Sequence, residues 1–319
     1  MCLSCSVFWY NFVENIDMDK NIFRSKSIAE LLNSMGLGKP AHPLIAVISN
    51  ADLCLREELI GMRFTSDMYC IALKDMGCGI DYGRNHYDFT DGVLIFTSPQ
   101  QVFTVKKAQD LNESQGWMLY FHPDLIRNTS LGANIDKYNY FNYEVYEALY
   151  LSEDEELILK NILNMIESEI NQRIDNHSQQ VLVSNIELIL NYSVRFYERQ
   201  MNTRSAQNSD IVAKVEKLLK KYYENNNLID VGQPTIQYLA DNCNVSASYL
   251  SDLLTKETGR PAKEHINDFI IDKAKHLLLS SEDSVSGIAY SLGFNYPHYF
   301  GRLFKQKTGF SPKDYRHVN

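Results

Sequence analysis

The sequence has no apolar run near the roughly 18 residues that a membrane-spanning helix requires. Its first residues, MCLSCSVFWYNFVENIDMDK, also lack the basic start and the small-residue cleavage site of a secretory signal peptide. Six cysteines are scattered through the 319 residues, so free thiols are expected rather than a disulfide framework. These absences predict a cytoplasmic protein with no membrane partner.

Signatures of catalysis are missing as well. The sequence contains no glycine-rich phosphate loop, no Ser-His-Asp pattern and no nucleotide-binding fingerprint. Cys2 and Cys5 form one CxxC at the terminus, without the second pair that a structural metal site needs. We therefore predict that the chain is no enzyme and has no catalytic residue, no bound metal and no cofactor.

The net charge of −9 hides a difference between the two halves of the chain. Residues 211–319 hold 14 Lys and Arg against 12 Asp and Glu, whereas the first 210 residues hold 17 against 28. Within the C-terminal part, residues 284–319 have five basic side chains and one acidic one. A local basic patch on an acidic protein is compatible with nucleic-acid binding, which the overall charge would not suggest.

Residues 44–121 contain short apolar runs separated by Gly, Asp, Asn and Pro. The runs are LIAVI, MYCIAL, GVLIF, QVFTV and GWMLYF. Runs of this length and spacing predict strands of a small β-barrel or sandwich.

Over residues 151–199 the spacing of apolar residues changes from that of strands to that of helices. Ser152 and Glu155 form a capping box, and apolar side chains then recur at helical spacing up to Ile170. A second amphipathic helix is predicted to run to about Arg199. These helices either pack on the N-terminal core or form a dimer seam. The polar stretch RQMNTRSAQNS (199–209) is typical of a linker.

The C-terminal part contains a repeat, with NVSASYLSDLLTKETGRP at 244–261 and GFNYPHYFGRLFKQKTGFSP at 293–312. Apolar residues before the turn match at an offset of 49: Ile236 with Val285, Leu239 with Ile288, and Ala240 with Ala289. After one inserted residue the offset is 50: Leu250 with Phe300, Leu253 with Leu303, and Leu254 with Phe304. Asn244 and Gly293 tolerate the left-handed conformation that ends a helix, and Ser246 and Asn295 are suitable N-caps.

Each copy therefore predicts a helix, a tight turn and a second helix that is apolar on one face, which is the helix-turn-helix pattern. Between the copies, residues 263–280 keep helical spacing and predict a connecting helix of about 27 Å. That length is close to the ~34 Å between successive major-groove faces on one side of B-DNA. Two copies would let one chain read two half-sites, and a plain helical bundle is the alternative.

The arrangement resembles the AraC/XylS family of transcriptional regulators. The residues that carry the likeness are IQYLADNCNVSASYLSDLLTKETGRP and AKHLLLSSEDSVSGIAYSLGFNYPHYFGRLFKQKTGFSPKDYR, with GVLIFTSPQQVFTV and GWMLYFHPDLI in the N-terminal part. The resemblance implies a multidomain α+β protein: a cupin-like N-terminal β-barrel with a helical extension, and an all-α C-terminal domain with two helix-turn-helix units joined by a linker helix. The expected divisions are a disordered leader (1–20), the barrel for effector binding or dimerisation (21–150), amphipathic helices (151–199), a linker (200–209) and the DNA-binding domain (210–319).

Ten outward positions of the two predicted recognition helices are candidate DNA contacts. They are Ser248, Ser251, Asp252, Lys256, Tyr296, Pro297, His298, Gly301, Arg302 and Lys305. Arg302 is the leading candidate because a guanidinium bonds guanine bidentately or clamps phosphate. Asp252 either accepts from cytosine or pairs with a nearby cation without touching DNA. Lys305 and Lys307 either neutralise phosphates or form a solvated face, and the same alternatives apply to Lys214, Lys217 and Lys221.

The family implies a small-molecule effector, and aromatic residues with polar tips are candidates to line its pocket. They are Tyr69, Tyr82, His86, Tyr87 and Trp117, with core or interface packing as the alternative. The expected partners are double-stranded DNA, a second copy of the chain, the effector and RNA polymerase. A metal-dependent cupin enzyme is one alternative function, although the chain has no H-x-H pair and His42, His86 and His122 stand apart. A protein-interaction module anchored to DNA is the other.

Overall fold

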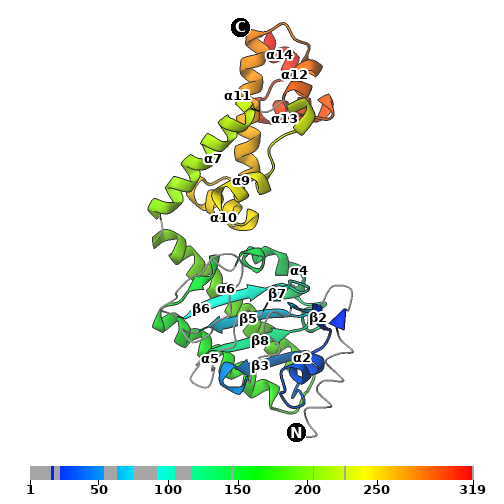
Figure 1. The fold of residues 1–319 in the computed structure, drawn as a ribbon, viewed down its shortest axis with the longest axis vertical. Helices are drawn as coiled ribbons and strands as arrows, with labels where there is room; N and C mark the ends of the chain where they lie inside the picture. The colour runs from blue at the N-terminus through cyan, green and yellow to red at the C-terminus, as the bar shows by residue number, and fades with distance from the viewer. Residues whose placement is uncertain are drawn as a thin grey trace. The chain divides into compact units, whose positions relative to one another are not determined.

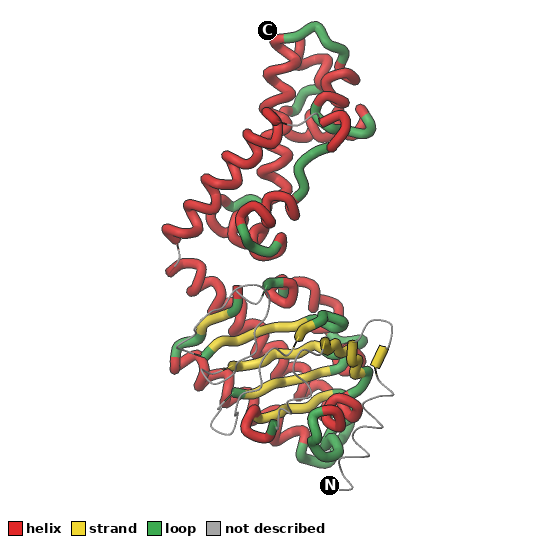
Figure 2. Tube along the Cα trace, in the orientation of Figure 1, coloured by secondary structure: helices red, strands yellow, loops and turns green. Residues whose placement is uncertain are grey.

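The computed structural model describes residues 16–17, 22–53, 63–74, 92–104, 116–144, 147–203, 205–225 and 228–317 (Figure 1). The chain divides into two compact units, residues 1–202 and 203–319, here called the N-terminal and C-terminal units. The N-terminal unit combines strands and helices, and the described C-terminal unit is helical (Figure 2). No helix among the described residues is long and apolar enough to cross a membrane.

The described strands of the N-terminal unit form two sheets. The larger sheet is antiparallel throughout, in the order β3 (Ile45–Ser49), β8 (Trp117–Phe121), β5 (Tyr69–Lys74), β6 (Val93–Thr97) and β9 (Leu149–Tyr150). The smaller sheet has the order β1 (Ile16–Asp17), β2 (Ile22–Ser25), β4 (Arg63–Ser66) and β7 (Phe103–Thr104), and its β2–β4 pair is parallel.

One face of the larger sheet packs against α2 (Ile28–Ser34). Alternate strand residues such as Ile48, Cys70 and Tyr120 share a core with Ile28 and Leu31 of this helix, as the two-residue period of a strand requires. Ser27 caps α2 by accepting a hydrogen bond from the N–H of Glu30.

The opposite face of the larger sheet is covered by α5 (Glu153–Ile170) and α6 (Ser178–Thr203), which lie behind it in Figure 1. Phe96 of β6 contacts Tyr140, with ring centres 4.3 Å apart, and Tyr140 stacks on Tyr197 of α6 at 5.4 Å. The Tyr140 hydroxyl donates to the carbonyl of Leu190 at 2.9 Å. Short helices α3 (Pro123–Ile126) and α4 (Ser130–Asn134) and 3₁₀ turns at 50–52, 135–137 and 139–142 complete this unit.

The last turns of α6 are fixed to the sheet by two side chains. Gln200 accepts from the N–H of Tyr150 at 2.8 Å and donates to the carbonyl of Ala148 at 3.1 Å. Its amide thus bonds the free edge of β9 as a neighbouring strand would. Arg199 binds both carboxylate oxygens of Glu155 at 2.7 Å and also donates to the carbonyl of Tyr150.

The five predicted strand runs coincide with β3, β5, β6, β7 and β8, and the Ser152–Glu155 capping box is present. The α+β assignment is therefore confirmed at that level. The described strands, however, lie in two open sheets rather than one closed ring. The predicted leader (1–20) lies outside the described residues except for Ile16–Asp17, which form β1. The polar stretch predicted as a linker is mostly helical, because α6 continues to Thr203 and α7 begins at Ser205.

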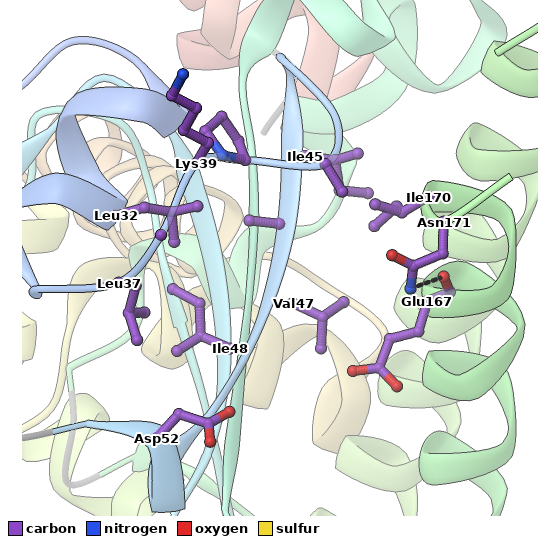
Figure 3. Close-up of a pocket in the computed structure, with 14 residues that line it drawn as sticks. Leu32, Leu37, Lys39, Ile45, Val47, Ile48, Asp52, Glu167, Ile170 and Asn171 are labelled. Carbon is purple, nitrogen blue, oxygen red and sulfur yellow. Dashed lines mark hydrogen bonds between the residues drawn. The ribbon is translucent and has the colours of Figure 1, made fainter. Parts of the chain in front are cut away.

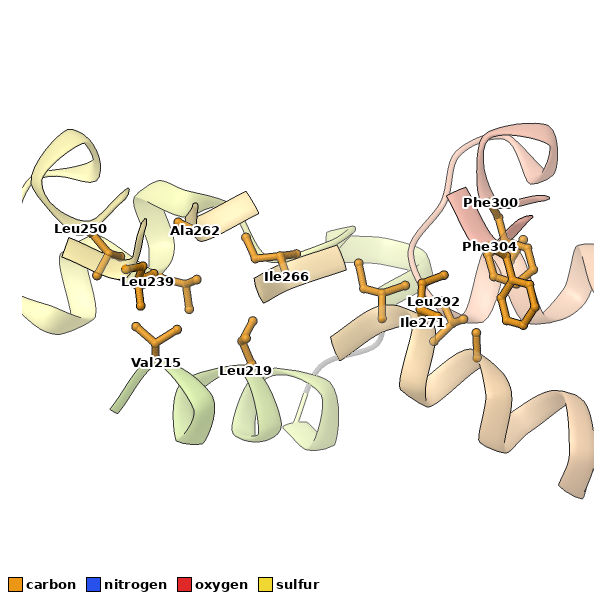
Figure 4. Close-up of a cluster of buried hydrophobic side chains, with 14 of the residues drawn as sticks. Val215, Leu219, Leu239, Leu250, Ala262, Ile266, Ile271, Leu292, Phe300 and Phe304 are labelled. Atoms are coloured by element: carbon orange, nitrogen blue, oxygen red, sulfur yellow. The ribbon is translucent and has the colours of Figure 1, made fainter. Parts of the chain in front are cut away.

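The C-terminal unit is built around one helix. Its helices are α7 (Ser205–Asn225), α8 (Leu228–Val231), α9 (Ile236–Cys243), α10 (Ala247–Thr258), α11 (Ala262–Ser280), α12 (Val285–Ser291), α13 (Pro297–Thr308) and α14 (Pro312–Arg316). The core runs along α11, with Leu239 and Leu250 at one end and Phe300 and Phe304 at the other (Figure 4). At 19 residues α11 is about 28 Å long, which agrees with the predicted connecting helix.

Candidate nucleic-acid interface

Two helix pairs of the C-terminal unit share the same turn. In the first pair, α9 ends at Asn244, which has φ 57°, and the N–H of Val245 bonds the carbonyl of Ala240 at 3.1 Å. In the second pair, Gly293 has φ 79°, and the N–H of Phe294 bonds the carbonyl of Ala289 at 3.0 Å. The left-handed residues predicted at the two turns are thus confirmed, and the bond that closes each turn is equivalent.

Gly293 is required by space as well as by its backbone angle. A Cβ atom at this position would lie 2.9 Å from the carbonyl carbon of Gly232 and 3.0 Å from the nitrogen of Gln233. A positive φ is also costly for residues other than Gly and, less so, Asn or Asp. The turn of the second pair therefore packs directly on the backbone between α8 and α9.

The two second helices begin differently. Ser246 caps α10, since its hydroxyl accepts from the N–H of Tyr249 at 3.1 Å. The predicted cap at Asn295 is wrong: Tyr296 is the N-cap of α13 and makes no side-chain capping bond. Pro297 follows at the first helical position, where its missing N–H costs nothing and its fixed φ suits a helix. The proline therefore stabilises the start of α13 in place of a capping oxygen.

Both second helices end in the same Thr-Gly motif. Gly259 and Gly309 are left-handed, at φ 74° and 82°, and their N–H groups bond the carbonyls of Thr255 and Lys305. The hydroxyls of Thr258 and Thr308 donate back to the carbonyls four residues earlier at 2.7 and 2.8 Å. The recurrence of Thr-Gly in the sequence thus reflects one helix-ending structure used twice.

The outward face of α13 carries a row of planar groups. Tyr296 and Tyr299 are 59% and 53% exposed, and His298 lies between them with its ring centre 4.2 Å from that of Tyr299. The guanidinium of Arg302 lies over the Tyr299 ring. Tyr296, His298, Arg302 and Lys305 are exposed as predicted, and Pro297 and Gly301 are partly covered.

Tyr299 is a candidate that sequence reasoning missed. Its position three residues after Tyr296 and three before Arg302 places all three on one helical face, and that spacing was the available signal.

Gly301 leaves an opening in the same face. A Cβ built on it would meet no atom of the described residues within 4 Å. Within the part of the chain that the structure describes, packing therefore requires no glycine there, and the residue lets an external group approach the backbone of α13 closely.

Lys305 and Lys307 point in different directions. Lys305 is exposed, whereas Lys307 is directed to α11, where it is bound by Glu264 and Asp268. These two carboxylates raise the pKa of Lys307, with the hydrogen bond to Asp268 as the largest cause. The structure therefore brings only Lys305 to the outward face.

The outward face of α10 is less basic. Ser248, Ser251, Asp252 and Lys256 share this face and are all partly covered, while the more exposed Thr255 donates to the carbonyl of Ser251 at 2.7 Å. On α7, the exposed Lys214, Lys217 and Lys221 lie opposite the buried Val215 and Leu219, as predicted.

Comparisons with known proteins agree with this geometry. Residues 239–317 match a family model described as a helix-turn-helix domain. The HTH-type transcriptional activator RhaS of Shigella dysenteriae serotype 1 is 25% identical over 256 residues, covering 78% of this chain and 85% of that protein. These two matches support the predicted resemblance to AraC/XylS transcriptional regulators. The helix-turn-helix match and the activator relative together indicate a DNA-binding transcriptional regulator.

Other relatives match a smaller share of the chain. RhaS of an Escherichia coli O9:H4 strain is 37% identical over 78 residues, which are 24% of this chain and 28% of the relative. Among solved structures, the C-terminal domain of the response regulator AraT from Geobacillus stearothermophilus has 31% identity, covers 34% of this chain and 85% of that one, and has a TM-score of 0.31. The DNA-binding domain of AdpA, solved with a target DNA, has 22% identity, covers 35% and 90%, and has a TM-score of 0.29.

The N-terminal unit holds the residues predicted here for an effector. Tyr82, His86 and Tyr87 lie outside the described residues. Tyr69 stacks on Phe121 with ring centres 5.1 Å apart, and Trp117 is buried with no hydrogen-bond partner for its indole N–H.

Tyr69 and Trp117 lie on the same face of the sheet but not together. Tyr69 is opposite Phe121 in the β5–β8 register, and Trp117 is opposite Leu73. Four residues of strand separate the two positions, which amounts to about 13 Å. They do not form one pocket by themselves.

A cavity of about 250 Å³ lies elsewhere, beside β3 (Figure 3). Leu32, Leu37 and Ile48 stand on one side of it, and the end of α5 stands on the other. There the amide of Asn171 donates to the carbonyl of Glu167 at 2.9 Å. Neither Tyr69 nor Trp117 lines this cavity.

Two described histidines of the N-terminal unit, His42 and His122, have structural partners. Nδ1 of His42 accepts from the N–H of Leu44, and Nδ1 of His122 accepts from the N–H of Asp124, where it caps α3. His86 lies outside the described residues. In the described part of the chain, no three His, Cys, Asp or Glu side chains are grouped to hold a metal ion.

Proposed function

We propose that the pairs α9–α10 and α12–α13 are two helix-turn-helix units, with α10 and α13 as recognition helices that enter successive major grooves. The observation that carries this proposal is that both pairs share a left-handed turn residue, an equivalent turn-closing hydrogen bond and the same helix ending, and that one helix of about 28 Å joins them. A single chain would then read two half-sites on one side of the duplex.

In this proposal α13 supplies most of the sequence reading. Arg302 bonds a guanine edge or clamps phosphate, Tyr296 and His298 approach the adjacent bases, and Lys305 neutralises a phosphate. Pro297 and Gly301 allow close approach. The smaller and less basic face of α10, with Ser248, Ser251, Asp252 and Lys256, reads through short side chains and bridging water. Lys214, Lys217 and Lys221 of α7 add phosphate contacts.

We infer that the N-terminal unit controls DNA binding. Its two sheets are proposed to belong to a cupin-like effector domain spanning residues 21–150, which takes a small molecule and uses Tyr69, Tyr82, His86, Tyr87 and Trp117. Exposed apolar residues on α5 and α6 support a homodimer: Leu157, Met165, Val181 and Leu188 are 40–57% exposed. Residues 151–199 would then form the dimer seam, and residues 200–209 would link it to the DNA-binding domain, 210–319.

The relatives named as transcriptional activators favour activation, with RNA polymerase as the further partner. The chain is proposed to work by binding rather than by catalysis, and in the cytoplasm, where its DNA is.

The experiment that tests the proposal begins with a selection from random-sequence DNA using the full-length protein. Fluorescence anisotropy then compares the selected duplex with a scrambled one at several salt concentrations. We expect a clear preference for the selected duplex and a salt slope that corresponds to several phosphates. Equal binding to both duplexes would reject sequence-specific recognition.

A further inference from the structure

Four charged side chains of the C-terminal unit link α11, α13 and the short segment between α10 and α11. Nζ of Lys307 contacts the Glu264 carboxylate and lies 2.8 Å from Oδ1 of Asp268. Asp268 is also 2.6 Å from the guanidinium of Arg260, through its other oxygen. Asp268 is thus shared by two cations, and Lys307 by two carboxylates. We call Arg260, Glu264, Asp268 and Lys307 the ion cluster.

The positions of these residues give the ion cluster its significance. Arg260 directly follows Gly259, which ends α10, and Lys307 lies in the last turn of α13. Glu264 and Asp268 are four residues apart on α11, so they project from the same face one turn after the other. The cluster therefore runs from the end of the first proposed recognition helix, across the connecting helix, to the end of the second.

Most side chains of the ion cluster are partly buried, which favours one fixed arrangement of the four groups. The side chains of Lys307, Asp268 and Glu264 are 21%, 31% and 37% exposed, and that of Arg260 is 56% exposed. Partly covered charges are screened less by salt than exposed ones. Linked pairs also restrict one another, unlike a single exposed pair, which contributes little.

The apolar contacts between α13 and α11 do not supply the same restraint. Phe300 and Phe304 are fully buried and hold α13 on the core. Apolar burial depends on the area removed from water and has little directional preference. Charge-assisted hydrogen bonds have preferred distances and angles. Lys307 therefore determines how the end of α13 is turned about the α11 axis.

We propose that the ion cluster fixes the spacing and orientation of α10 relative to α13, and so makes the protein selective for the number of base pairs between two half-sites. This inference rests on the proposed function of α10 and α13 as recognition helices. In it, Lys307 is a positioning residue that does not touch DNA. One inserted base pair shifts a half-site by about 3.4 Å and turns it by about 35° around the duplex axis.

The test uses the full-length protein and the duplex selected from random-sequence DNA. Three versions of that duplex are compared, with the native spacing between half-sites and with one base pair added or removed. The measured quantity is the ratio of affinity for native spacing to affinity for altered spacing. We expect Lys307→Gln to lower this ratio at least threefold, with an unchanged slope of log affinity against log salt. Lys307→Arg should restore the ratio.

Lys305→Gln is the matched control, because Lys305 is the exposed lysine of the same turn. We expect it to weaken binding equally at all three spacings and to reduce the salt slope by about one. Asp268→Asn removes a negative charge of the ion cluster on α11 and keeps the shape of the side chain. It should lower the spacing ratio as Lys307→Gln does, and it tests the proposal independently if that variant folds poorly.

Either of two results would overturn this inference and leave the proposed function standing. The first is an unchanged spacing ratio in Lys307→Gln and Asp268→Asn while both still prefer the selected duplex to a scrambled one. The second is a Lys307→Gln variant that behaves like Lys305→Gln, which would make Lys307 a phosphate contact. If the wild-type protein bound selected and scrambled duplexes equally, the proposed function would fall, and the inference with it.

Discussion

The guanidinium carbon of Arg302 lies 5.6 Å from the centre of the Tyr299 ring, one helical turn earlier on α13. At this distance the cation is attracted by the negative face of the ring. Both groups face outward, and Tyr299 is itself flanked by the His298 ring. The contact restricts a long side chain that otherwise has many rotamers, so Arg302 is held in place on the outward face of α13.

Replacing Tyr299 by alanine should weaken specific binding by about 0.5–1 kcal/mol, which is roughly two- to fivefold, because the contact that restricts Arg302 is lost. Tyr299→Phe keeps the ring face and should bind almost as the wild type does. Anisotropy on the selected duplex measures both variants. If the phenylalanine variant were as weak as the alanine variant, the Tyr299 hydroxyl would itself contact DNA.

Arg302→Ala should cost about 1–3 kcal/mol of specific binding and relax the preference at one base position. Arg302→Lys retains the charge but loses the planar fork that bonds guanine bidentately. We therefore expect the lysine variant to keep the salt slope of the wild type while its base preference is reduced. A repeated selection from random-sequence DNA reads that preference, and unchanged sequences from both variants would remove Arg302 from the base contacts.

Gly301→Ala separates folding from binding. The added methyl group contacts no described residue, and alanine is a better helix former than glycine. The free energy of unfolding should therefore stay equal or rise by about 0.5–1 kcal/mol. DNA affinity should nevertheless fall, because the methyl group occupies the space through which DNA approaches. Gly309→Ala is the opposite control: its φ of 82° is strained for alanine, so stability falls. Undiminished affinity in Gly301→Ala would place DNA away from that turn.

Acid should weaken the N-terminal unit through His42. Burial lowers the pKa of this imidazole below its ordinary 6.5, and its Nδ1 accepts a hydrogen bond from Leu44. The unfolded chain takes up the proton near pH 6.5 and the folded chain only at lower pH. The stabilising contribution is therefore present above pH 6.5 and is lost as the pH falls through the folded pKa.

Urea unfolding between pH 7 and 5, followed by tryptophan fluorescence, measures this effect, because both tryptophans of the chain lie within residues 1–202. His42→Asn provides a non-titrating acceptor at the same place. Its unfolding free energy should depend less on pH than that of the wild type. An equal dependence in the two proteins would assign the acid sensitivity to other groups.

The repeat in the C-terminal unit was predictable because its determinants are local. Asn244 and Gly293 mark turns by their backbone preference, and Leu250 and Phe300 mark buried faces by their spacing. Neighbours in sequence determine such features, so the sequence alone predicts them well. The five strand runs were predictable for the same reason.

Features that depend on distant residues were missed. The pairing of β2 with β4 joins segments about forty residues apart, and no local sequence pattern predicts this pairing. Lys307 looked like one more exposed lysine, and only the packing of α13 on α11 brings it to Asp268. Tyr69 and Trp117 were predicted as candidates to line one pocket, but their separation depends on the register of β5 with β8.

The amide of Gln200 bears on how the N-terminal unit can be isolated. Gln200 and Arg199 together bond the backbone of Ala148 and Tyr150 at the edge of β9, so a protein cut before Arg199 would lose these bonds at that edge. An uncovered edge strand is a template on which another chain can add. We therefore expect such a fragment to self-associate through β9. A fragment that ends at Asn202 keeps the edge covered.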